Sequence, residues 1–96
     1  MSKLFIVVSY DISDRKRLYR VAKEMKNWGV RVQKSVFECK LTEANYLKMK
    51  KIIEKIIKKE EDSVRFYILC KKCVERIEYM GLTPPPLKDS EEFEII

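Results

Sequence analysis

Residues 3–10 (KLFIVVSY) form the first strongly patterned segment, and their β-branched and aromatic composition predicts a strand. The segment does not alternate between apolar and polar positions, so both of its faces are apolar. Continuous apolar runs of this kind are typical of strands that are covered on both sides. Residues 11–14 follow as a turn, in which Ser13 or Asp14 is expected to cap a helix.

Two segments have the spacing of amphipathic helices. The first is predicted to run from the turn to about Trp28, where Asn27 and Gly29 close it. The second begins after Thr42 as its cap, and its lysines form a solvated face. The apolar stripes are Leu18, Val21, Ala22, Met25 and Trp28 in the first helix, and Tyr46, Met49, Ile52, Ile53, Ile56 and Ile57 in the second.

The remaining pattern predicts further strands. Residues 30–41 alternate, but the phase slips at Lys34 and Ser35, which indicates two short strands joined by a tight turn or bulge. Residues 64–70 alternate cleanly and predict another strand, and residues 76–79 predict one more short strand. A proline-rich spacer at residues 83–86 then leads to an extended terminal segment.

The order β-α-β-β-α-β predicts an α+β, ferredoxin-like fold, with an antiparallel four-stranded sheet and two helices on one face. We assign residues 1–82 to this domain and residues 83–96 to a proline-led C-terminal extension. Because the helices can shield only one face of the strand at residues 3–10, the other apolar face predicts a homodimer that meets sheet to sheet. The extension is expected to pair, as an extra strand segment, with a sheet edge in the dimer.

Composition narrows the class of protein. The longest apolar run, residues 4–8, is far shorter than the ~20 residues of a membrane span, and no signal peptide precedes it, so we expect a cytoplasmic location. Lys and Arg number 21 against 15 acidic residues, and residues 1–59 hold 16 cations and 6 anions. Such a basic body indicates a polyanionic partner, usually nucleic acid; the alternative is a lysine-rich solvated surface.

Three cysteines in a chain without an export signal are expected to be reduced thiols. Cys70 and Cys73 form a C-x-x-C pattern, which partly fits a redox motif that opens a helix after a strand. A closed zinc site cannot be built from one subunit, because the chain has no histidine and only Cys39 as a third sulfur. We expect the pair to pack at the end of a strand instead.

Asp11 is the first candidate for chemistry, since it directly follows a buried strand at the margin of the sheet. Mg²⁺ typically takes one or two carboxylates together with waters and phosphate oxygens. A two-fold axis near the end of this strand would bring two copies of Asp11 together and so supply both carboxylates. The alternative is a turn aspartate that accepts hydrogen bonds from backbone N–H groups.

A cluster of cations opens the first predicted helix, where positive charge opposes the helix macrodipole. This placement of Arg15, Lys16 and Arg17 favours phosphate binding over a solvated surface. Arg31, on the strand after Gly29, is expected to point toward the same end as Asp11. Three aromatic side chains are candidates for stacking on bases, although aromatics of a small core more often pack: Tyr10, Tyr19 and Phe37.

Two blocks of sequence together form a long signature that rarely arises by chance: residues 8–14 (VSYDISD) and residues 29–38 (GVRVQKSVFE). Their combination resembles the small CRISPR adaptation protein family, the second CRISPR-associated core protein, often called the CRISPR-associated endoribonuclease. The resemblance extends over nearly the whole chain. It implies a ferredoxin-like homodimer.

The resemblance also implies a function. Members of the family are metal-dependent nucleases that act on single-stranded RNA or double-stranded DNA, and Asp11 matches the catalytic metal ligand contributed by each subunit. Magnesium, or manganese in its place, is the implied cofactor. The family also bridges two dimers of the CRISPR integrase during insertion of new spacers. The matching nucleic-acid-binding positions are Arg15, Arg17, Arg31 and Phe37.

Three functions therefore stay open. The first is a magnesium-dependent endonuclease, and the second is a non-catalytic dimeric DNA scaffold for spacer integration. Both need the basic surface, but only the first needs a metal at Asp11. The third is a toxin-like ribonuclease, which the genomic neighbourhood would distinguish from the other two.

Overall fold

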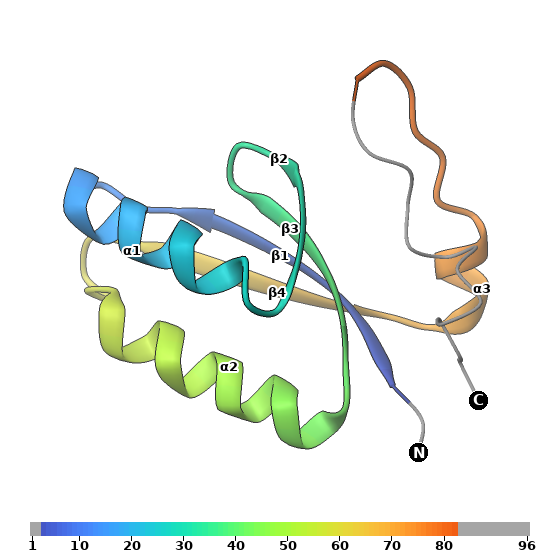
Figure 1. Cartoon of the computed structure of the whole chain (residues 1–96), viewed down its shortest axis with the longest axis horizontal. Helices are drawn as coiled ribbons and strands as arrows, with labels where there is room; N and C mark the ends of the chain where they lie inside the picture. Colours follow the sequence, from blue (N-terminus) through green and yellow to red (C-terminus); the bar gives the residue numbers. More distant parts are fainter. Residues whose placement is uncertain (1–2, 83–96) are drawn as a thin grey trace.

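The computed structural model describes residues 3–82, and its four strands form one antiparallel sheet in the order β2-β3-β1-β4 (Figure 1). This arrangement, with both long helices on one side, is the ferredoxin-like βαββαβ fold that the sequence predicts. The elements are β1 (Leu4–Asp11), α1 (Arg15–Met25), β2 (Gly29–Gln33), β3 (Val36–Leu41), α2 (Glu43–Ile56), β4 (Ser63–Leu69) and α3 (Lys71–Glu75).

Strand β1 lies in the middle of the sheet and pairs with both β3 and β4. Its register with β4 runs from Phe5 opposite Leu69 to Asp11 opposite Ser63. Asp11 therefore marks one end of the sheet, while the start of α3 lies at the other end, beyond Leu69 (Figure 1).

The predicted phase slip is confirmed as two short strands. A turn at Lys34 and Ser35 joins β2 to β3, and the register of this pair shifts between Arg31 and Gln33. The backbone N–H of Tyr10 donates to the carbonyl oxygen of Ser35 over 3.1 Å, which ties this turn to the end of β1.

Both predicted helices are present, and their caps are confirmed. The side chain of Asp14 accepts from the backbone N–H of Arg17 over 3.0 Å, and that of Thr42 accepts from Asn45 over 3.2 Å. The first helix ends at Met25 rather than near Trp28, whose N–H closes a turn on the Met25 carbonyl.

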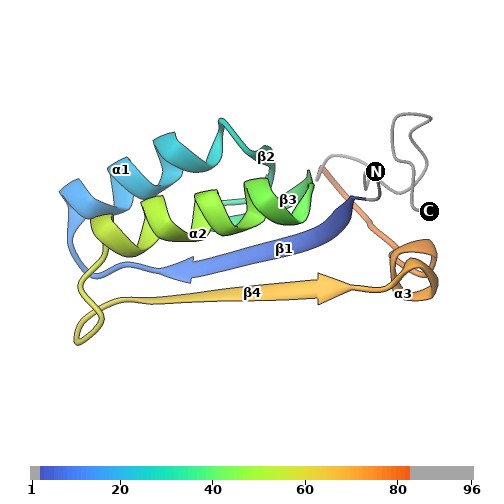
Figure 2. The same ribbon diagram turned by 90° about the horizontal axis from the view of Figure 1, so that it is seen from below.

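The main core lies between these helices and the sheet, as Figure 2 shows. Alternate residues of β1 point into it because side chains of a strand alternate between faces. Its buried members are Ile6, Val8, Tyr10, Ile12, Val21, Met25, Phe37, Cys39, Leu41, Tyr46, Met49, Ile53 and Ile56.

The predicted strand at residues 76–79 is wrong. The short helix α3 follows β4, and residues 76–79 after it form a turn and irregular chain. Val74 of α3 is fully buried against Phe5, and Ile77, one helical turn further on, packs on the same small cluster. Together these two side chains cover Phe5.

This small cluster changes the interpretation of the apolar second face of β1. Phe5 is covered by the same chain, so a partner is not required to bury it. The half-buried Val7 packs against the same cluster, whereas Tyr67, its partner on β4, is exposed.

The proline-led extension at residues 83–96 and its predicted pairing with a sheet edge lie outside the described residues. None of the helices in residues 3–82 has the length and apolar composition needed to span a bilayer.

Candidate functional site

Asp11 lies exposed at the end of β1, on the rim of a shallow cavity of about 340 Å³. Its carboxylate makes no hydrogen bond or ion pair with any residue in the described range 3–82, so it does not act as a turn aspartate that accepts backbone N–H bonds. The carboxylate is thus available to a ligand. The cavity is lined by Tyr10, Asp11, Ile12, Leu18, Arg31, Lys34 and Ser35.

Arg31 reaches this cavity from β2, as the sequence predicts. Its guanidinium carbon lies 5.7 Å from the centroid of the Phe37 ring, a cation–π contact. Phe37 is itself fully buried, and it also stacks on Tyr10 with ring centroids 6.2 Å apart. Phe37 is therefore a core residue beneath Arg31, and its predicted role in binding nucleic acid is not retained.

Arg17 is engaged within the chain. Its Nε donates to Oδ2 of Asp62 over 2.8 Å and its Nη2 donates to Oε1 of Glu61 over 3.0 Å. The Arg17 side chain is only 13% exposed, and that of Asp62 is fully buried. Arg17 thus joins α1 to the loop before β4, and we do not retain it as a phosphate ligand.

The Asp62 carboxylate is a buried hydrogen-bond acceptor next to the site that could not be predicted from the sequence. Besides Arg17, it accepts hydrogen bonds from the backbone N–H groups of Lys58 and Ser13, over 2.9 and 3.0 Å. The Arg17 guanidinium, followed by these N–H groups, holds the pKa of Asp62 well below its usual range. The available signal was an acidic residue directly before a strand, which does not identify a partner 45 positions away.

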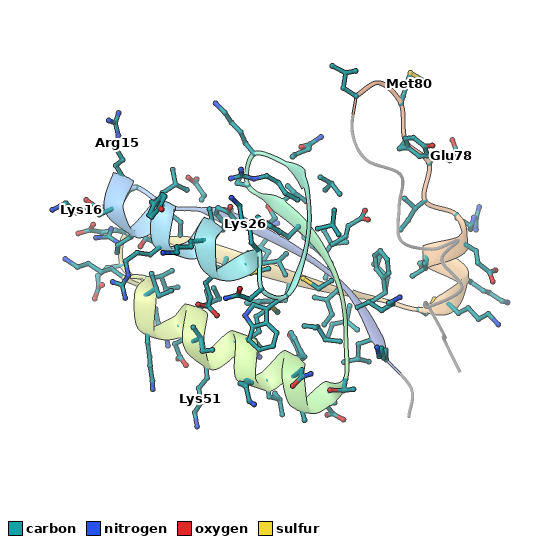
Figure 3. All side chains as sticks on the ribbon, in the orientation of Figure 1. Arg15, Lys16, Lys26, Lys51, Glu78 and Met80 are labelled. Atoms are coloured by element: carbon teal, nitrogen blue, oxygen red, sulfur yellow. The ribbon has the colours of Figure 1, made fainter. Side chains whose placement is uncertain are left out.

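Arg15 and Lys16 remain as exposed cations in the first turn of α1. Both side chains point away from the body of the molecule in Figure 3. Neither makes an ion pair within the described part of the chain. They are consequently available to phosphate groups in solution.

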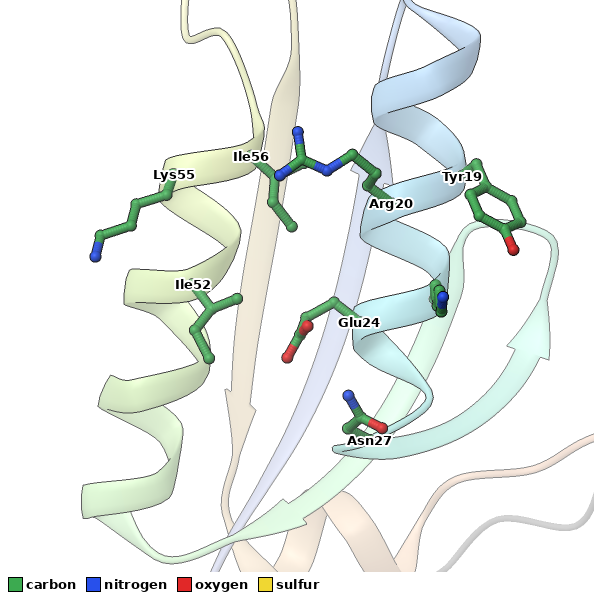
Figure 4. Close-up of a pocket in the computed structure, with 8 residues that line it drawn as sticks. Tyr19, Arg20, Glu24, Asn27, Ile52, Lys55 and Ile56 are labelled. Atoms are coloured by element: carbon green, nitrogen blue, oxygen red, sulfur yellow. The ribbon is translucent and has the colours of Figure 1, made fainter.

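A second hollow, of about 520 Å³, lies between α1 and α2 (Figure 4). Ile52 and Ile56 form an apolar wall on α2, and Glu24 accepts a hydrogen bond from the Trp28 indole N–H over 2.9 Å. The cations around it are Arg20, Lys23 and Lys55. It shares no lining residue with the cavity at Asp11, so the two hollows are separate surfaces.

The described residues do not by themselves complete a metal site. Among residues 3–82, no group of three or more His, Cys, Asp or Glu side chains is placed to hold an ion. The oxygen donors of Asp11 suit Mg²⁺ or Mn²⁺, which also take water and phosphate oxygens. Asp11 by itself therefore supplies one carboxylate ligand of the kind such an ion takes.

The predicted strand-end packing of Cys70 and Cys73 is wrong, because both are exposed. Cys70 is the N-cap of α3, so the pair does open a helix directly after a strand. Cys39, by contrast, is buried in the main core.

The comparisons with known proteins cover nearly the whole molecule. The family model for CRISPR associated protein Cas2 matches residues 4–77. A CRISPR-associated endoribonuclease Cas2 from Chloroflexus aurantiacus is 42% identical over 94 residues, 97% of this chain and 100% of the relative. Cas2 from Streptococcus pyogenes superimposes with a TM-score of 0.72 and 41% identity, over 80% of this chain and 99% of that chain.

A chain of a partial Cas6-RT-Cas1–Cas2 complex is also similar, with a TM-score of 0.71 and 26% identity, over 80% of this chain and 84% of that chain. The family match, the sequence identity and the fold agree. The chain therefore belongs to the CRISPR associated protein Cas2 family.

Proposed function

We propose that this chain is an endonuclease of CRISPR adaptation, which works as a homodimer and hydrolyses phosphodiester bonds with magnesium held by Asp11 from each subunit. The observation that carries the proposal is the Asp11 carboxylate, which is exposed and makes no hydrogen bond or ion pair within residues 3–82. The name of the Chloroflexus aurantiacus relative, an endoribonuclease, supports the same activity.

The residues around Asp11 supply the positive charge that a nucleic acid requires. Arg31 lines the same cavity, and its guanidinium lies over the ring of Phe37. Arg15 projects from the first turn of α1 into solvent. In this scheme the two arginines bind the phosphates that flank the bond to be cut.

The cofactor fits the donor set. Magnesium, or manganese in its place, would supply the positive charge that neutralises a scissile phosphate and activates water. Asp11 would hold the ion, and the other protein oxygens would come from the second subunit. With no histidine in the chain, no imidazole is present to act as general base.

The test compares wild type with Asp11→Asn on short single-stranded RNA and duplex DNA, with Mg²⁺, with Mn²⁺ and with EDTA. We expect wild type to cut at least one substrate, EDTA to abolish cutting, and Asp11→Asn to lose it. Light scattering should show the same dimer for both proteins.

Glu60→Gln is the matched control, since Glu60 is an exposed carboxylate without a hydrogen bond or ion pair within the described residues. It should cut as wild type does. If wild type cuts no substrate with either metal, the proposed nuclease activity is contradicted. If the protein is a monomer in dilute solution, the proposed metal site between two subunits is contradicted.

A second candidate is a non-catalytic scaffold for spacer integration, in which the dimer binds duplex DNA between copies of the integrase. The similar chain in the Cas6-RT-Cas1–Cas2 complex favours it. Under this function Asp11→Ala would leave spacer acquisition intact in cells, whereas loss of acquisition as well as cutting would exclude the scaffold alone.

A further inference from the structure

Cys70 and Cys73 form a pair of exposed thiols at the end of the sheet opposite Asp11. Cys70 follows β4 and caps α3, and the N–H of Val74 donates to the carbonyl oxygen of Cys70 over 3.0 Å. Cys73 lies in the first turn of the same helix, three residues after Cys70. The two exposed thiols therefore belong to one turn of the backbone.

Packing does not account for these thiols. The apolar contact that seats α3 on the sheet is made by Val74 and Ile77 on Phe5, and neither cysteine belongs to that cluster. A structural cysteine in this chain looks different: Cys39 is buried, and desolvation raises the pKa of its thiol to about 12.

The pKa values of the two exposed thiols are shifted in opposite directions. Hydrogen bonds from the N–H and thiol of Cys73, and from the N–H of Lys72, lower the pKa of Cys70. The hydrogen bond and charge of Cys70 raise the pKa of Cys73 in turn. A thiol with a lowered pKa beside a thiol with a raised pKa is the arrangement that thiol–disulfide exchange uses.

We infer that Cys70 and Cys73 are a redox-active dithiol, which is oxidised to an intramolecular disulfide by exchange with a low-molecular-weight disulfide. The Cys70 thiolate attacks one sulfur of that disulfide, which forms a mixed disulfide and releases one small thiolate. Cys73 loses its proton and attacks the Cys70 sulfur, which releases the second. The protein loses two protons and two electrons, and the oxidant takes them up to become two thiols.

The test uses the full-length protein and oxidised glutathione, with acid quenching and intact-mass measurement over time. Wild type is expected to lose the mass of two hydrogen atoms and to keep no glutathione. Cys73→Ser should accumulate one glutathione on Cys70. Cys70→Ser should react at least several-fold more slowly at neutral pH, because it lacks the thiol whose pKa is lowered.

Cys39→Ser is the matched control and should behave as wild type, since a buried thiol does not take part. Circular dichroism checks that each variant keeps the fold. Wild type that ends with two glutathiones, with a disulfide between chains, or with no reaction overturns the inference. None of these readouts depends on nuclease activity, so a failure here is distinct from a failure of the proposed function.

Discussion

The Nε of Arg17 donates a hydrogen bond of 2.8 Å to Oδ2 of Asp62, from the first turn of α1 to the loop that precedes β4. The same carboxylate accepts from the N–H of Ser13, only two residues after Asp11. The Arg17–Asp62 pair therefore connects α1 and the loop before β4 to the chain just after β1, close in sequence to the candidate catalytic residue Asp11.

Replacing Asp62 with Asn should lower the thermal stability by at least several degrees. The amide removes the negative charge that faces Arg17 and turns one acceptor into a donor opposite N–H groups, while the site is fully buried. Thermal unfolding followed by circular dichroism measures the shift. Glu61→Gln is the control: Glu61 is 53% exposed, so its loss should change Tm by at most a few degrees.

Acid should weaken the protein through the same carboxylate. The folded-state pKa of Asp62 is lower than its unfolded value, so its contribution is complete above pH ~4 and is lost as the pH falls through the folded pKa. The Tm difference between wild type and Asp62→Asn should consequently be largest near neutral pH and narrow below pH ~4. Tm scans across that range check this, and a difference that stays constant with pH would contradict it.

Gly29→Ala should destabilise the edge of the sheet by about 1–3 kcal/mol. A Cβ at this position would lie 2.3 Å from the carbonyl oxygen of Glu38 and 2.6 Å from the sulfur of Cys39, so the β2–β3 pair would have to separate. Urea unfolding gives the change in free energy. Gly81→Ala is the contrast: its Cβ would have no neighbour within 4 Å among residues 3–82, so the positive φ accounts for the cost, about 1 kcal/mol.

Val74→Ala should loosen α3 from the sheet and cost about 1–3 kcal/mol, because a fully buried side chain against Phe5 is removed. Hydrogen exchange should show faster exchange of the α3 amides than in wild type. Lys72→Ala, at an exposed position of the same helix, should leave both measurements close to wild type. Equal effects of the two substitutions would argue against the packing role of Val74.

Arg31→Ala should weaken binding to RNA or duplex DNA while Tm stays near the wild-type value. The exposed guanidinium faces the cavity at Asp11, and its cation–π contact with Phe37 adds at most about 1 kcal/mol. The slope of log affinity against log salt concentration should become shallower by an amount that corresponds to roughly one phosphate contact. Arg17→Ala should show the reverse pattern, a lower Tm at unchanged intrinsic affinity, since Arg17 is paired with Asp62.

The order of elements could be predicted from the sequence because its signals are local along the chain. Caps at Asp14 and Thr42 satisfy backbone groups three residues away, and the phase slip before Val36 follows from strand alternation. The position of Asp11 after a buried strand follows from the same pattern, so the sequence was sufficient to locate the candidate site. Its metal and its second subunit stay predictions.

Only the tertiary structure decided which side chains are available to bind a ligand. Phe37 and Arg17 are indistinguishable from surface ligands in the sequence, yet one is fully buried beneath Arg31 and the other is paired with Asp62. Residues 76–79 do not form the predicted strand, and Val74 of the preceding helix and Ile77 instead meet Phe5, far away in the chain. Periodicity and capping act within a few residues, whereas burial and ion pairing depend on which distant segments the fold brings into contact.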